Sequence, residues 1–115
     1  MALTGTAERL MIYLEQTEHK GSTPAYVEIV ERARKAGLAG ATVLQGIEGF
    51  GVTSRIHRHH TLSVVEDVPV VVIVIDTPTR IESFLASLDD MHLEGLVVRQ
   101  PVEVVAHRAR STRRR

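Results

Sequence analysis

Apolar residues recur along this chain with two different periods, which divide most of it into strands and helices. The short apolar runs contain Ile, Val, Tyr or Thr and are typical of strands: they cover residues 10–14, 41–47 and 70–75. A last strand is expected at 96–98 and 102–105, where Pro101 interrupts it and indicates a bulge or a sheet edge. Residues 61–66 are ambiguous and can extend as a further strand.

Two other segments show the spacing of amphipathic helices. The first covers residues 24–36, and a Thr-Pro pair at 23–24 supplies an N-cap followed by proline at the first helical position. The second begins in the same way with a Thr-Pro pair at 77–78, carries an apolar stripe, and is closed by Gly95. The two halves of the chain therefore resemble a loose internal duplication.

The order of the elements is βαββαβ. This order fits an α+β class and the ferredoxin-like fold, in which a four-stranded antiparallel sheet carries two helices on one face. The face without helices should alternate toward polar residues. Residues 10–14 and 70–75 do not alternate, so we expect a second copy of the chain to cover that face in a homo-oligomer.

The 115 residues are enough for one domain with a single core, which we place at residues 1–107. The absence of cysteine excludes disulfides, thiolate metal sites and thiol nucleophiles. No apolar run approaches the roughly 20 residues that cross a bilayer, and the first residues lack the pattern of a signal peptide. We therefore expect a cytoplasmic protein that does not itself span a membrane.

The net charge is zero, but five of the fourteen basic residues lie in the last eight positions. Residues 108–115 therefore form a basic tail, expected to be disordered, on a body with an acidic excess. Such a tail is either a solvated terminus or a contact for nucleic acid or a membrane surface. RNA on the sheet is not expected, because that mode stacks bases on exposed aromatic residues and the chain has two Phe and two Tyr.

The segment between the second and third strands contains the candidate chemistry. Gly46, Gly49 and Gly51 do not form a dinucleotide fingerprint, because a strand rather than a helix follows them. They permit either tight bends or a close approach of the backbone to an anionic ligand. A polar cluster comes next, made of Thr53, Ser54, Arg55, His57, Arg58, His59 and His60.

This polar cluster has three interpretations. It is a solvated loop, an anion site in which Arg55 and His57 donate charge-assisted hydrogen bonds, or a metal site. His57 and His59 share a side of an extended segment and His60 adjoins them. One loop rarely completes a coordination shell, so further ligands would come from across a subunit interface.

Arg99, on the last strand, is either a contact for a ligand lodged between subunits or an exposed ion-pair partner. No nucleophile, base and orienting group occur together in the sequence, so we expect no catalytic residues and no enzyme activity.

The chain resembles the PII-like proteins of a domain-of-unknown-function family. The resemblance covers about residues 8–105, and its matching text is LMIYL, the helix from Pro24 to Gly37, GLAGATVLQGIEGFG, SRIH, EDVPVVVIVID and DMHLEGLV. It implies a ferredoxin-like homotrimer with nucleotide sites in the clefts between subunits. It also implies a long loop after the second strand that docks on a target such as a transporter or an enzyme.

By position, that loop is residues 46–60, and the residues that match the family's GFG and SRIH text are Gly49, Gly51, Ser54, Arg55 and His57. The chain departs from PII proteins in two places. Residues 49–60 contain no tyrosine, and residues 91–96 are too short and acidic for the glycine- and lysine-rich phosphate loop of those proteins.

Three functions are consistent with these observations. The preferred one is a PII-like signalling or regulatory protein that binds a small anionic effector, with an adenine nucleotide as one candidate, between subunits, and acts on a partner through the 48–60 loop. Its expected ligand contacts are Gly49, Gly51, Ser54, Arg55, His57 and Arg99. The second is a trimeric divalent-metal-binding protein, similar to the divalent-cation-tolerance proteins, whose ligands are His57, His59 and His60. The third is an interaction module without a small ligand, working through the loop and the arginine tail.

Overall fold

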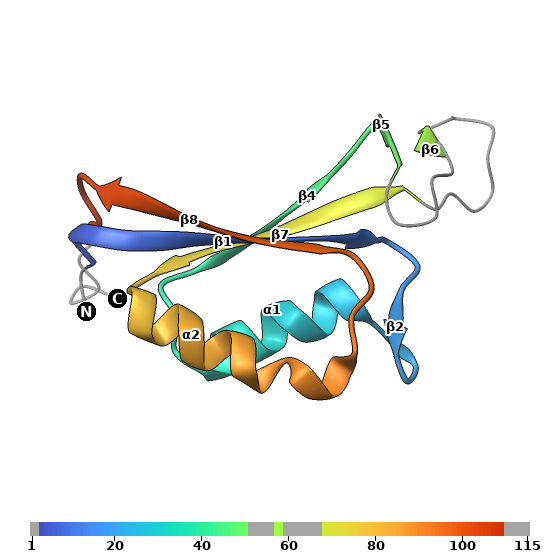
Figure 1. Cartoon of the computed structure of the whole chain (residues 1–115), viewed down its shortest axis with the longest axis horizontal. Coiled ribbons are helices and arrows are strands. Elements are labelled where there is room, and N and C mark those ends of the chain that lie inside the picture. Colours follow the sequence, from blue (N-terminus) through green and yellow to red (C-terminus); the bar gives the residue numbers. More distant parts are fainter. Residues whose placement is uncertain (1–2, 51–56, 59–67, 110–115) are drawn as a thin grey trace, which may run out of the picture.

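A computed structural model describes residues 3–50, 57–58 and 68–109 of the chain. Strands and helices alternate along it (Figure 1). In chain order the elements are β1 (Gly5–Glu15), β2 (His19–Lys20), β3 (Thr23–Pro24), α1 (Ala25–Lys35), β4 (Ala41–Gln45), β5 (Glu48–Gly49), β6 (His57–Arg58), β7 (Pro69–Asp76), α2 (Pro78–Ser87), the 3-10 helix η1 (Asp89–Met91) and β8 (Leu96–Val104).

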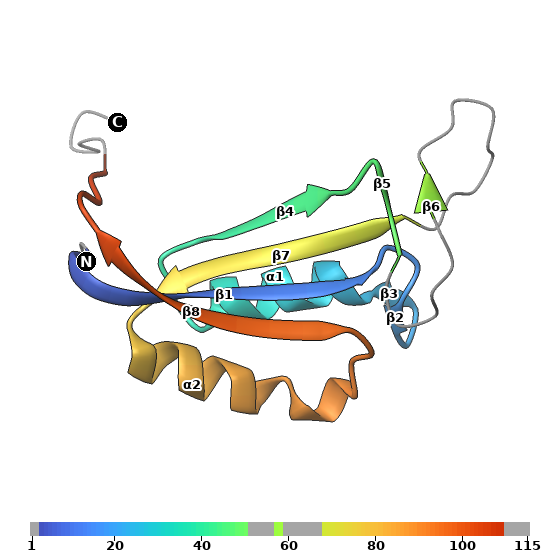
Figure 2. The same ribbon diagram turned by 45° about the horizontal axis from the view of Figure 1, so that its top comes forward.

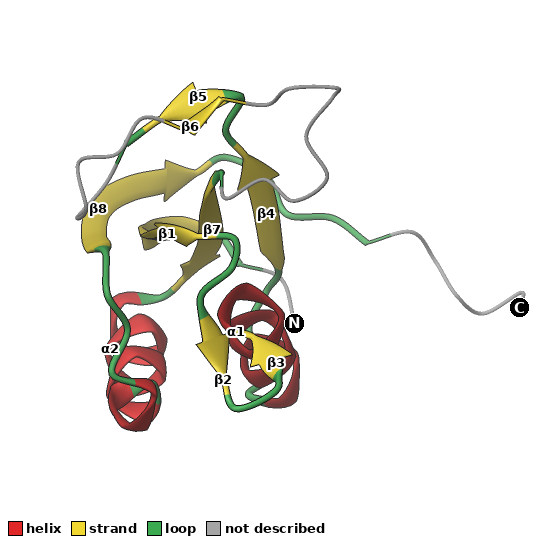
Figure 3. Cartoon of the chain, turned by 90° about the vertical axis from the view of Figure 1, so that its right-hand side faces the viewer, coloured by secondary structure: helices red, strands yellow, loops and turns green. Residues whose placement is uncertain are grey.

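The main sheet has the strand order β4-β7-β1-β8, and each neighbouring pair is antiparallel. Both helices lie against one face of this sheet, as the view along the strands shows (Figure 3). β2 pairs with β3, and β5 with β6, as two short hairpins outside the sheet. The predicted α+β, ferredoxin-like arrangement is therefore confirmed.

The core lies between the sheet and the two helices. Along β7 the side chains alternate between buried and partly buried positions, because successive residues of a strand point to opposite faces. The residues that point toward the helices are buried among side chains of α1 and α2, and the largest fully buried ones in this layer are Leu10, Ile12, Ile29, Val72, Val74 and Ile81.

The two predicted helix starts have different outcomes. At the second, Thr77 caps α2 as predicted, because its hydroxyl accepts a hydrogen bond from the backbone N–H of Arg80 at 3.3 Å. At the first, the predicted side-chain cap at Thr23 is wrong: Thr23 and Pro24 form β3, and the helix begins at Ala25. The N–H of Ala25 donates instead to the carbonyl of Glu18, which removes the need for a capping hydroxyl.

The end of the second helix and the last strand also differ from expectation. His92 ends η1 in the left-handed conformation, so the prediction that Gly95 closes the helix is wrong. Gly95 instead has a φ of +146° and lies so close to β1 that an added Cβ would be 2.0 Å from the carbonyl oxygen of Tyr13. β8 runs through Pro101 without the expected interruption, whereas the sheet edge that Pro101 indicated is confirmed, because an edge strand accommodates a residue that has no N–H.

The helices in the described part of the chain are too short and too polar to span a bilayer.

Candidate functional site

The base of the predicted loop is held against the start of β7. The N–H of Gly46 donates to the carbonyl oxygen of Pro69 at 2.7 Å, and a Cβ added to Gly46 would lie 2.9 Å from Cγ of that proline. Gly49 passes the same ring, at 3.3 Å from an added Cβ. These two glycines therefore allow the chain to pass closely over Pro69 where it leaves β4.

Of the predicted ligand contacts in the loop, the structure describes Gly49 and the backbone of His57, which face each other in the β5–β6 hairpin. Gly51, Ser54, Arg55, His59 and His60 lie outside the described residues, as do residues 61–66 and most of the basic tail. Anion or metal binding by these side chains therefore stays a prediction. Within the described ranges, no three His, Asp or Glu residues are grouped as a metal site would require.

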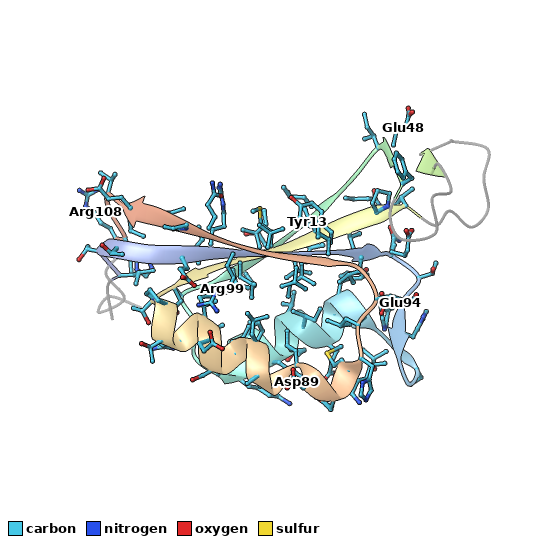
Figure 4. The ribbon with its side chains drawn as sticks, in the orientation of Figure 1. Tyr13, Glu48, Asp89, Glu94, Arg99 and Arg108 are labelled. Carbon is cyan, nitrogen blue, oxygen red and sulfur yellow. The ribbon has the colours of Figure 1, made fainter. Side chains whose placement is uncertain are left out.

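Arg99 lies on the helix-facing side of the sheet, opposite Leu10 of β1 (Figure 4). Its Nη2 is 2.6 Å from Oε1 of Glu8, and its Nη1 pairs with Glu82 of α2. Hydrogen bonds to Glu82 and then Glu8 raise the pKa of its guanidinium. Arg99 thus links β8 to β1 and α2, and its contact with a ligand between subunits stays a prediction.

The other face of the sheet is apolar and carries no helix. Cross-strand partners share a face, and Tyr13 is opposite both Val71 and Leu96. Leu44, Tyr13 and Leu96 are 52, 39 and 58 % exposed. We call this surface the open face; its apolar residues are Met11, Tyr13, Leu44, Val71, Ile73, Ile75, Leu96 and Val98.

A cavity of about 380 Å³ opens at one end of the open face. Its walls come from the turn before β4, the end of β7, and the segment that follows β8 (Figure 2). That last segment is fastened to the N-terminus, because Nδ1 of His107 accepts a hydrogen bond from the N–H of Leu3 at 2.7 Å. The lining residues include Ala39, Gly40, Thr42, Ile73, Ile75 and His107.

This cavity has no evident signature in the sequence. Its walls come from four segments of the chain, one of them the residue Leu3 before β1, and most of their side chains are small or aliphatic. Thr42 and His107 are the polar ones that carry a hydroxyl or an imidazole. Nothing in the residues around His107 indicates its place beside Leu3, which comes from the fold.

An ionic cluster lies on the helix side, where Arg32 of α1 meets Asp90 of η1. Both guanidinium Nη atoms of Arg32 contact the Asp90 carboxylate, at 2.7 and 3.0 Å, and Nη1 also donates to the carbonyl of Ser87. Lys20 is 3.3 Å from the same carboxylate. Hydrogen bonds from Arg32 and then Lys20 hold the pKa of Asp90 below its usual range. The cluster joins the two halves of the chain.

Comparisons with known proteins agree with this fold. The family described as DUF190, Uncharacterized ACR, COG1993, matches residues 7–104. A UPF0166 protein of Aquifex aeolicus (strain VF5) is 36 % identical over 96 residues, which cover 84 % of this chain and 90 % of that protein.

Among solved structures, the fold is similar to that of CPII, a nitrogen regulatory PII-like protein from Thiomonas intermedia K12. CPII bound to ADP, AMP and bicarbonate matches with a TM-score of 0.64 and 19 % identity, over 86 % of this chain and 88 % of CPII. CPII bound to ADP and bicarbonate matches with a TM-score of 0.63 and 17 % identity over the same shares. The chain therefore belongs to the DUF190 family and has the ferredoxin-like fold of PII-like proteins.

Proposed function

We propose that this protein is a cytoplasmic, non-catalytic PII-like regulatory protein. In this proposal it forms a homotrimer, binds a small anionic effector between subunits, and acts on a partner protein such as a transporter or an enzyme through the 48–60 loop. An adenine nucleotide is the first candidate effector. The observation that carries the proposal is the apolar open face with a cavity at its end, on a fold similar to that of a nucleotide-bound PII-like protein.

The homotrimer is supported by the exposure of the open face. Large apolar patches on a soluble protein are typical of interaction sites. Here Leu44 and Leu96 are more than half exposed at the two edges of the sheet, with Tyr13 between them. A second copy of the chain that covers this face would remove these side chains from water.

The effector site is supported by the cavity. Small-molecule sites commonly have volumes of about 300–1,000 Å³, and this cavity has about 380 Å³. The β5–β6 hairpin lies at the other end of the sheet (Figure 2). A ligand that contacts both the cavity and the loop would therefore lie between two subunits, with Arg55 and His57 as its proposed charged contacts.

Effector binding is tested by thermal-shift and calorimetric titration of the full chain with AMP, ADP, ATP, cyclic nucleotides and bicarbonate. We expect a saturable response to an adenine nucleotide that Arg55→Ala abolishes. Arg34→Ala is the matched control, because Arg34 is exposed on α1 and pairs only locally with Glu31. A protein that responds to none of these compounds would contradict the proposed effector class.

The oligomeric state is tested separately by size-exclusion chromatography with light scattering. We expect the mass of a trimer, and a lower mass for Ile73→Asp, because this change places a charge in the middle of the open face. A monomer at micromolar concentration would contradict the trimer. Deletion of residues 48–60 tests the partner contact, since recovery of the same partners by the shortened chain would argue against docking through the loop.

A further inference from the structure

Edge strand β8 has a partly uncovered side where it runs beside α2. Val97 of β8 and Ile12 of β1 are cross-strand partners on the helix-facing side. Ile12 is 1 % exposed, whereas Val97 is 47 % exposed. A groove of about 240 Å³ lies at this place, lined by these two residues and by Leu85 and Leu88 of α2. It offers an apolar side chain from another molecule a contact with both the sheet and the helix.

The backbone of β8 is available for pairing beside this groove. In the described sheet, β8 pairs with β1 on one side and has no strand on the other. β8 stays in register with β1 through Pro101, which has no N–H, so Pro101 occupies a position whose N–H would point away from β1. Because strand positions alternate, the N–H and C=O groups of Val97 and Arg99 also point to the outer edge.

Pro101 therefore limits backbone pairing at the outer edge to one half of β8. A segment that pairs with β8 finds donors at Val97 and Arg99 but none at Pro101. The half with donors is the half beside the groove. Backbone pairing and side-chain insertion thus fall at the same place, as in complexes where a peptide adds a strand to a sheet edge and fills pockets with alternate side chains.

The exposed polar residues of this region favour a basic ligand. Asp89 and His92 line the groove beside its apolar floor. Asp89 begins η1 and Glu94 lies in the segment between η1 and β8 (Figure 4), and neither forms an ion pair with a residue in the described ranges. Asp90, by contrast, is neutralised by Arg32 and Lys20. Lysine or arginine side chains beside the groove are therefore favoured over acidic ones.

We propose that β8 and α2 form a docking site for an extended segment of a partner protein. The segment pairs with the outer edge of residues 96–100, inserts an apolar side chain between Val97 and α2, and carries a lysine or arginine near Asp89. The groove opens on the helix side of the sheet, whereas the open face is on the other side. Both surfaces can therefore be used at once.

β8 supplies a matched pair of variants for the test. Val97→Pro removes an outward N–H beside the groove, and Glu103→Pro removes one beyond Pro101. Both positions have the same alternation as Pro101, so both variants keep the hydrogen bonds to β1. Thermal unfolding of each variant verifies that the fold is retained.

The probe is a fluorescently labelled peptide of about eight alternating valine and lysine residues, and its binding to the full chain is followed by anisotropy. We expect saturable binding, weakened about tenfold by Val97→Pro and less than about twofold by Glu103→Pro, because only Val97→Pro removes an N–H and a valine side chain at the groove itself. Asp89→Asn should weaken binding about threefold, and a valine–glutamate peptide should not bind.

Three results would overturn this proposal. The first is the absence of saturable binding of the valine–lysine peptide. The second is an equal loss of binding in the two proline variants, which would show that the groove half of β8 has no special role. The third is a lower oligomer mass for Val97→Pro by light scattering, which would show that a second copy of the chain occupies this edge.

Discussion

Asp76 is a buried carboxylate that connects the two halves of the fold, and its removal should lower the free energy of unfolding. It is the last residue of β7 and is 3 % exposed. Its Oδ2 accepts from the N–H of Ala39 at 2.9 Å, and its Oδ1 accepts from the N–H of Thr77 at 2.7 Å. Arg80 Nε is 3.4 Å from Oδ1. The carboxylate thus fastens the turn before β4 to the first turn of α2.

The magnitude follows from these contacts. Each backbone hydrogen bond to a charged group contributes about 1.5–3 kcal/mol, and a buried N–H left without a partner loses this contribution. The pair with Arg80 adds about 0–1 kcal/mol, because the arginine is 37 % exposed. We expect Asp76→Ala to lower the free energy of unfolding by about 4 kcal/mol, out of a typical total of about 5–15 kcal/mol. Asp76→Asn keeps one acceptor and should cost about 2 kcal/mol.

Urea unfolding followed by far-UV circular dichroism measures this loss. All variants are compared at one protein concentration, because the stability of an oligomer depends on concentration, and the m-value should not change. Glu82→Gln is the control: its carboxylate is 69 % exposed, so removing its charge should cost less than about 1 kcal/mol. An Asp76→Ala variant within about 1 kcal/mol of the wild type would refute the reasoning.

Two further predictions concern single positions. Gly95→Ala should lower the free energy of unfolding by about 3 kcal/mol or more, because its Cβ would meet the Tyr13 carbonyl at 2.0 Å. Thermal unfolding measures this loss. The control is Gly21→Ala, which has open space around it and should lower the free energy of unfolding by only about 1 kcal/mol. Asp90→Asn should be less stable than the wild type, by an amount that is constant above about pH 5.5 and shrinks below about pH 4. The reason is that Arg32 and Lys20 lower the pKa of the carboxylate in the folded protein, so its stabilising effect is lost as the carboxylate is protonated. A deficit that persists unchanged at pH 2 would contradict this assignment.

The pattern of apolar residues along the chain determined the architecture of this protein. Residues 10–14 and 70–75 gave the two central strands, and the two helical stripes gave the helices that cover one face of the sheet. These features are local, since periodicity and turn chemistry depend on residues that are close together in the sequence. The Thr77 cap is also a local feature, and the inference that both faces of the central strands are apolar came from local sequence as well.

Contacts between segments far apart in the sequence could not be obtained in this way. Asp76 meets Ala39, Arg32 meets Asp90, and Leu3 meets His107, each across more than 35 positions. At Thr23 the partner is nearer in sequence but was equally unmarked, since the N–H of Ala25 that a hydroxyl would have capped reaches the carbonyl of Glu18. Local sequence states what a side chain can donate or accept, but the fold decides which partner is near.

The candidate site shows the same division. The sequence identified the glycines that leave β4 and the histidine- and arginine-rich segment that follows, because these residue types are unusual beside an aliphatic core. It did not identify the cavity or the groove beside α2, whose walls are ordinary aliphatic side chains brought together from different elements. Only the tertiary structure decides such surfaces, because a concave site is a property of how elements pack and not of any one segment.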